Sequence, residues 1–136
     1  MLNAACLFVA GALHATIPAT QFTVAWTHSV ARTRWEERYR VEDGALRLVV
    51  ARVQGSGAGM EPGDDAVLRD GWWTWTPRIA PLREVRLTLS SYTQGYDLCW
   101  RGRCRTLRSL VARAAGPVLA DGTSVELRAC GSQPHE

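Results

Sequence analysis

Hydrophobic and polar residues alternate with a period of two along most of the chain, in short runs separated by turn signals. A period of two is the pattern of β-strands with one buried face. Asp-Gly pairs in "EDGA" and "ADGT" are typical of tight hairpins. We therefore expect a mainly β fold, a single antiparallel β-sandwich or open barrel of about seven to nine short strands. The runs lie near residues 22–30, 35–42, 45–54, 72–76, 84–90, 95–100, 103–106 and 124–130.

One segment departs from this alternation. "LRSLVARAAGP" places apolar residues on one helical face, and Gly116 and Pro117 follow as a stop signal, which predicts one short helix near 107–115. With 136 residues, the chain is long enough for one domain with a core and short for two. No repeat or linker divides it, so we expect a single β-rich domain over residues 20–136.

The apolar stretch "LNAACLFVAGALHATIPA" lies at the N-terminus, and Arg32 is the first charged side chain. Such a stretch is typical of the hydrophobic region of a secretory signal, and Pro18 with its small neighbours fits a cleavage zone. We expect residues 1–19 to be a signal peptide or an N-terminal anchor. A first buried strand is the alternative interpretation.

The cysteines also favour export. If the Arg-Gly pair between Cys99 and Cys104 is the turn of a hairpin, the two cysteines face each other as a close, non-hydrogen-bonded pair. Their separation then suits a disulfide, which needs an oxidising compartment. Zinc is the alternative, but no further ligands stand at a matching spacing. Cys130 is left without a partner if Cys6 is removed with the signal.

The net charge of the chain is small, +3, and all 16 basic residues are arginine. Guanidinium groups match carboxylates and phosphates, which suggests recognition of planar anions, and codon bias of the genome is the alternative explanation. The arginines are interspersed with acids and form no stripe or run. We therefore expect no nucleic-acid partner.

The stretch "TVAWTHSVARTRWEERYRV" places His28 beside Ser29, a pairing that invites a serine-hydrolase interpretation. If residues 22–30 and 35–42 form a hairpin, one register gathers the aromatic and aliphatic residues on one face and sets His28 opposite Glu37. Successive side chains of a strand point to opposite faces. His28 and Ser29 therefore cannot be a base and its nucleophile while both lie in this strand.

Continuing the sheet through the next turn brings Arg52 diagonal to Glu37. His28, Glu37 and Arg52 would then converge on the inner face of the sheet. Buried charges are costly unless they are paired. The trio is thus either a structural network that fixes the register or a binding site, and both interpretations stay open.

The glycine-rich sequence "GSGAGM" follows the strand of Arg52 directly. Glycines let consecutive N–H groups curve into an anion-holding nest, although the spacing is not that of a phosphate-binding P-loop. We expect no cofactor and no metal. The candidate ligand-binding residues for a small anion are His28, Glu37, Arg52, Gly55, Ser56, Gly57 and Gly59.

The tryptophans of "DGWWTWTP" also alternate, so Trp73 and Trp75 share one face of a strand. Aromatic stripes in strands usually belong to the core, and a ligand-stacking platform is the alternative.

Several segments together resemble one bacterial family, the domain of unknown function DUF1850. They are "FTVAWTHSV", "WEERYRVEDGALRLV", "ARVQGSGAGMEP", "DGWWTWTP" and "LCWRGRC". The resemblance implies a small exported protein whose gene lies beside a TRAP-type transporter of the TAXI subclass. Such transporters pair a periplasmic solute-binding protein with a fused permease. The family pattern has an acidic residue after His-Ser-Val, where this chain has Ala31, and the resemblance implies no reaction.

We therefore expect an exported accessory or small-anion-binding module of the periplasm or cell envelope, associated with TRAP/TAXI-type solute uptake. Its expected partners are a TRAP-type permease or its solute-binding protein, and a small anionic solute. One alternative is a hydrolase with His28 and Glu37 as acid and base, which is disfavoured because no nucleophile or metal set is visible. The other is a purely structural subunit that docks on a permease.

Overall fold

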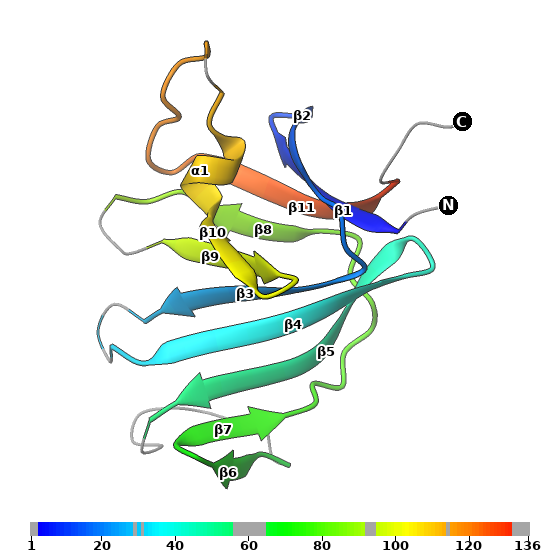
Figure 1. The fold of residues 1–136 in the computed structure, drawn as a ribbon, viewed down its shortest axis with the longest axis vertical. Helices are drawn as coiled ribbons and strands as arrows, with labels where there is room; N and C mark the ends of the chain where they lie inside the picture. The colour runs from blue at the N-terminus through cyan, green and yellow to red at the C-terminus, as the bar shows by residue number, and fades with distance from the viewer. Residues whose placement is uncertain are drawn as a thin grey trace.

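The computed structural model describes residues 3–28, 30, 32–55, 65–91, 95–113 and 115–131. Within these residues, eleven strands form two antiparallel sheets and one short helix is present. The sheets do not close into a barrel, so the expected mainly β, sandwich-like fold is confirmed (Figure 1). None of the described helical residues forms a segment long and apolar enough to span a membrane.

The smaller sheet has four strands, and the larger has seven. The smaller one is ordered β2 (Ala12–Ile17), β1 (Ala4–Val9), β11 (Ser124–Cys130) and β8 (Val85–Thr88). The larger one is ordered β10 (Arg103–Thr106), β9 (Tyr96–Trp100), β3 (Gln21–Thr27), β4 (Arg34–Glu42), β5 (Ala45–Gln54), β7 (Trp72–Trp75) and β6 (Val67–Arg69). Eight of these strands match the predicted runs, and β1, β2 and β6 are additional.

The core lies between the two sheets. Phe22 and Leu98 of the large sheet meet Leu7 and Leu127 of the small one, and all four are essentially buried. On β5 the core ends at Leu48. Figure 1 shows the remaining strands of the large sheet, β7 and β6, extending away from the small sheet. One end of the large sheet's inner face is therefore not covered by the small sheet.

The segment expected to be a signal or anchor forms β1 and β2. β1 is a central strand, paired with β2 on one side and with β11 on the other. Cys6 of β1 is bonded to Cys130 of β11, which supplies the partner that the sequence had left open. Export and cleavage of this segment stay a prediction, but the fold supports the alternative interpretation, a buried strand.

The predicted helix is present but shorter than expected: α1 spans Leu107–Val111. The hydroxyl of Thr106 caps its N-terminus by accepting a hydrogen bond from the Ser109 N–H at 3.1 Å. The chain is already extended at Ala112, four residues before the expected glycine stop. Leu107 and Val111, one turn apart, carry the buried face.

The predicted Cys99–Cys104 disulfide is present. The two residues pair directly across β9 and β10, with a Cα–Cα distance of 4.0 Å. Arg101 and Gly102 have φ of 52° and 78°, as a two-residue hairpin turn requires.

The predicted register between β3 and β4 was wrong by four residues. Trp26 lies opposite Trp35, and Val24 lies opposite Glu37. His28 is outside the strand, because its N–H bonds to the Thr33 carbonyl and closes a longer loop. A shift of four is even, so the side chains that remain within β3 and β4 stay on their predicted faces. The register gains a direct stack of Trp26 on Trp35, with ring centroids 6.1 Å apart.

The predicted register between β4 and β5 was correct at one end only. Tyr39 pairs with Leu48 as expected, but an irregularity follows, and Arg38 pairs with Val50. The extra residue, Val49, is a β-bulge, and it turns the rest of β5 over by one position. Arg52 therefore pairs with Glu36, on the face opposite to Glu37.

Candidate functional site

The structure does not bring the predicted trio together. His28 is an exposed loop residue whose Nδ1 accepts the Val30 N–H at 3.3 Å. Glu37 lies opposite Val24, four positions before His28 in the chain. At about 3.3 Å per residue, roughly 13 Å of strand separates the two. His28 and Glu37 are thus not placed to act together as acid and base.

Arg52 belongs to the outer face of the large sheet. Its Nε donates to the Glu36 carboxylate at 2.8 Å, and its guanidinium lies 4.0 Å from the centroid of the Trp72 ring. The hydrogen bond joins β5 to β4, and the ring contact joins β5 to β7. The prediction that Arg52 shares a site with Glu37 was wrong because the bulge reverses its direction.

The glycine-loop prediction falls mostly outside the described residues. Ser56, Gly57 and Gly59 are not described. Gly55 has a φ of 136°, a conformation that favours glycine, and its N–H donates to the Gly71 carbonyl at 3.0 Å. That N–H closes the end of β5 onto β7 and is not directed at a nest.

Four aromatic side chains gather on the inner face instead, and we call them the aromatic patch: Tyr96 of β9, Trp26 of β3, Trp35 of β4 and Trp75 of β7. The Trp26 ring stacks on Trp35 and meets Tyr96 edge-on at 5.8 Å, while Trp35 meets Trp75 edge-on at 6.4 Å. All four are half-buried. Strand alternation and pairing put them on one surface, at the end that the small sheet leaves uncovered.

One carboxylate lies within this surface. Glu37 follows Trp35 by two residues and precedes Tyr39 by two, so all three point to the inner face. The Tyr39 hydroxyl donates to Glu37 Oε1 at 2.8 Å. Across the sheet, Glu37 faces Val24 and Ala51. Its four nearest neighbours in the sheet thus include two rings and two aliphatic residues, and no positive charge.

This environment raises the pKa of three groups. Burial raises the pKa of Glu37, and the hydrogen bond from Tyr39 offsets this only in part. Burial first, and then the Glu37 charge, raise the pKa of Tyr39. The same two causes raise the pKa of Tyr96, which shows that its ring lies within electrostatic reach of Glu37. Both phenols therefore stay protonated and can serve as hydrogen-bond donors.

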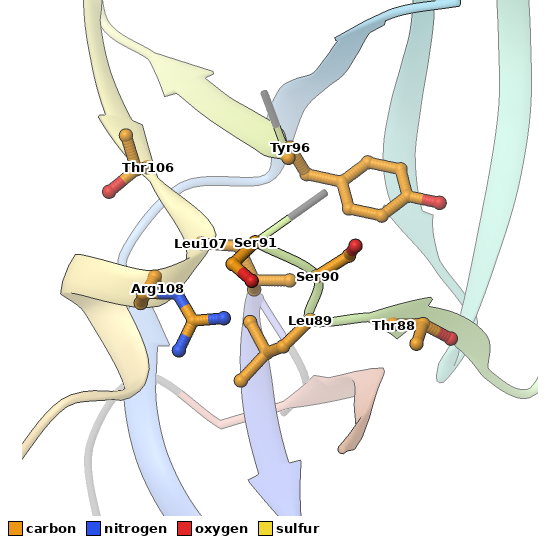
Figure 2. A pocket seen from close by; sticks show the side chains of 9 residues that line it. Thr88, Leu89, Ser90, Ser91, Tyr96, Thr106, Leu107 and Arg108 are labelled. Carbon is orange, nitrogen blue, oxygen red and sulfur yellow. The ribbon is translucent and has the colours of Figure 1, made fainter. Parts of the chain in front are cut away.

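A cleft of about 270 Å³ adjoins the patch at Tyr96. Figure 2 shows the Tyr96 ring along one side of it, extending away from α1, with its hydroxyl remote from Arg108. Arg108 is not a free cation here, because it bonds to the Leu119 carbonyl at 3.1 Å and to Asp121 at 3.3 Å. The cleft offers mainly hydroxyl and apolar lining, from residues that include Thr88, Leu89, Ser91, Thr106 and Leu107.

The uncovered end also keeps unused hydrogen-bonding capacity. Among the described residues, the indole N–H groups of Trp35 and Trp73 are buried without an acceptor. Such groups are uncommon in native proteins, and each costs about 1–3 kcal/mol. Ala51 and Val53 are buried in this region although they lie outside the core cluster. The tryptophans that pair with these two residues across the sheet form, together with them, a second apolar cluster beside the core.

No group of three or more histidine, cysteine, aspartate or glutamate side chains that could hold a metal is found in the described ranges. All four cysteines are in disulfides.

Fold and site together define a small, disulfide-bonded antiparallel β-sandwich with an aromatic patch around one carboxylate. The chain belongs to the family described as a domain of unknown function (DUF1850), whose model matches residues 22–107, more than half of the chain. The matched region contains the whole aromatic patch and Glu37, while β1, β2 and β11 lie outside it. No curated protein and no solved structure matches the chain.

Proposed function

We propose that the protein is an exported accessory module that binds a small solute on the aromatic patch during TRAP/TAXI-type uptake. The observation that carries the proposal is the patch itself: four half-buried rings from four strands share one face with a half-buried carboxylate, at the edge of the core, against which Trp26 and Tyr96 pack. Aromatic side chains supply a large and rigid contact surface at low entropic cost. Such a surface favours binding over structural packing alone.

The link to uptake is supported by the family. The resemblance to DUF1850 proteins implies export and a gene beside a TAXI-type transporter, so a TRAP-type permease or its solute-binding protein is the proposed partner. The two disulfides are compatible with an extracellular location.

The geometry gives less support to the other functions. A hydrolase with His28 and Glu37 as acid and base would need both groups within reach of one substrate atom, and they are far apart along the strand. A small-anion site built on Arg52 would need that guanidinium to be free, but it is bonded to Glu36. Arg34, the first residue of β4, is likewise bonded to Asp97 at 2.8 Å.

The proposed function is tested by thermal unfolding of the purified protein with a panel of organic cations, dicarboxylates, phosphates and neutral sugars. We expect at least one class to raise the unfolding midpoint of the wild type. The same solute should not raise the midpoint of Trp35→Ala, which lacks the central ring of the patch. It should still raise that of Trp72→Ala, a control on the outer face of the sheet.

A different result is expected if the protein docks on a permease and binds no ligand. In that case no solute shifts the wild-type midpoint, while a tagged wild-type protein retains the permease from detergent-solubilised membranes and Trp35→Ala loses it. That result would replace the binding proposal with the purely structural one.

A further inference from the structure

We infer that the ligand of the aromatic patch carries a positively charged ammonium group, for which Glu37 is the counter-charge. This inference rests on the proposed function, and it names the class of solute that the patch selects. The arginine-rich sequence suggested an anionic ligand, whereas this inference assigns a cationic one.

The first support is the arrangement of rings. Trp26 and Trp35 present stacked indoles, and Tyr96 and Trp75 stand edge-on at the two sides. The faces of aromatic rings carry partial negative charge and attract cations, with tryptophan the strongest. Several rings around one position are the usual way in which proteins recognise quaternary ammonium groups.

The second support is the isolated charge of Glu37. Within the described residues, Glu37 forms no ion pair with an arginine or histidine, and its recorded polar contact is the neutral Tyr39 hydroxyl. A half-buried carboxylate without a counter-ion is unfavourable, so a cation that binds there supplies the missing counter-charge, and the pairing offsets part of the cost of desolvating both groups. Burial raises the pKa of Glu37, and the hydrogen bond from Tyr39 lowers it only in part.

The third support is the contrast with Glu36, the next residue on the same strand. Glu36 faces the outer side, where Arg52 bonds to it at 2.8 Å and where Arg34 and Arg38 flank it two residues away. The chain thus supplies arginines to the outer carboxylate and none to the inner one. Glu36 is therefore a matched control for Glu37.

The experiment is a titration of the full-length protein with choline, followed by tryptophan fluorescence and calorimetry at low salt. The comparison ligand is dimethylbutanol, the neutral analogue in which carbon replaces the ammonium nitrogen. We expect choline to bind about tenfold more tightly than this analogue. Glu37→Gln should abolish the preference, and Glu36→Gln should keep it.

A second variant separates the rings from the charge. Trp35→Leu keeps apolar bulk but removes the aromatic face, so it should weaken choline binding severalfold and leave the neutral analogue nearly unaffected. Vesicles of phosphatidylcholine and of phosphatidylglycerol show whether the ammonium group belongs to a free solute or to a lipid headgroup. Binding of free choline alone indicates a solute, and binding of phosphatidylcholine vesicles as well indicates a headgroup.

The outcomes distinguish this inference from the function on which it rests. If both choline and its neutral analogue bind equally, or if Glu37→Gln keeps the preference, the ammonium inference is wrong and a binding module remains. If an anion binds to the patch instead, the inference is equally wrong. If neither ligand binds and no solute of the wider panel shifts the unfolding midpoint, both proposals fail.

Discussion

At the scale of single residues, Glu36 and Glu37 show how strand alternation gives neighbouring carboxylates opposite roles. Glu36 points outward and is bonded to Arg52 at 2.8 Å. Glu37 points inward, and its recorded hydrogen bond comes from the neutral hydroxyl of Tyr39. The first carboxylate has an ion-pair partner, whereas burial penalises the charge of the second and raises its pKa. The two neighbouring carboxylates thus affect the stability of the fold in opposite directions at neutral pH.

Glu37→Gln should therefore stabilise the free protein at pH 7. The pKa of Glu37 is raised above 4.5 in the folded state, so the protonated form favours folding. Its contribution is complete below pH 4.5 and is lost as the pH rises through the folded pKa. Gln keeps an acceptor for Tyr39 and carries no charge. We expect a gain of about 1 kcal/mol in the free energy of unfolding at pH 7, and almost none near pH 4.

The control for this prediction is Glu36→Gln, measured by urea unfolding at the same two pH values. It should lower the free energy of unfolding at pH 7 by at most about 1 kcal/mol, because its partner pair is partly exposed. Equal destabilisation by both substitutions would mean that Glu37 has a counter-charge in solution, contrary to the contacts described above.

At the scale of strands, the faces of β3 and β4 could be predicted from the sequence, but the register between them could not. Alternation put Trp26 and Trp35 on the inner face, and an error of four residues left that result intact. The bulge in β5 had a visible signal. The outward polar residues Arg47 and Arg52 are five positions apart, an odd interval that a regular strand cannot place on one face. The apolar run around Val49 hid the position of the extra residue.

The candidate site was predicted only in part for the same reason. Glu37 was assigned to the inner face correctly, and so were Trp26 and Trp35. His28 was assigned wrongly because the loop closes through a backbone hydrogen bond that no side-chain pattern records. Arg52 was assigned wrongly because the position of the bulge was hidden in the apolar run around Val49. Tyr96 was missed because its contact with Trp26 requires the pairing of β9 with β3, and these two residues are 70 positions apart in the chain.

Arg52→Met tests the corrected placement of Arg52 between β4 and β7. The substitution removes a partly exposed ion pair with Glu36 and a contact with Trp72, while it keeps apolar contact with the ring. We expect a loss of about 1 kcal/mol in the free energy of unfolding. Solute responses measured by thermal unfolding should match those of the wild type. A selective loss of an anion response would restore the anion site that the sequence suggested.

At the scale of the whole molecule, the small sheet joins both ends of the described chain. β1 pairs with β11 over six residues, and the Cys6–Cys130 bridge closes a loop of 124 residues. The Cys99–Cys104 bridge spans only five positions within one hairpin. In the chain-entropy view, stabilisation grows with loop length. The two disulfides are thus expected to differ in their effect, although each joins neighbouring strands.

The paired substitutions Cys6→Ser/Cys130→Ser should lower the free energy of unfolding by about 4–5 kcal/mol, and the pair Cys99→Ser/Cys104→Ser by about 2 kcal/mol.

A chain that begins at residue 20 should lose cooperative unfolding altogether, because it lacks two of the four strands of the small sheet and exposes the core partners of Leu7 and Ile17. The measurements are denaturant unfolding of the three variants and the intact mass of the wild type purified from its native cells. If the shortened chain unfolds at the wild-type midpoint and the purified wild type lacks residues 1–19, the segment is a signal peptide and the small sheet does not persist in the mature protein.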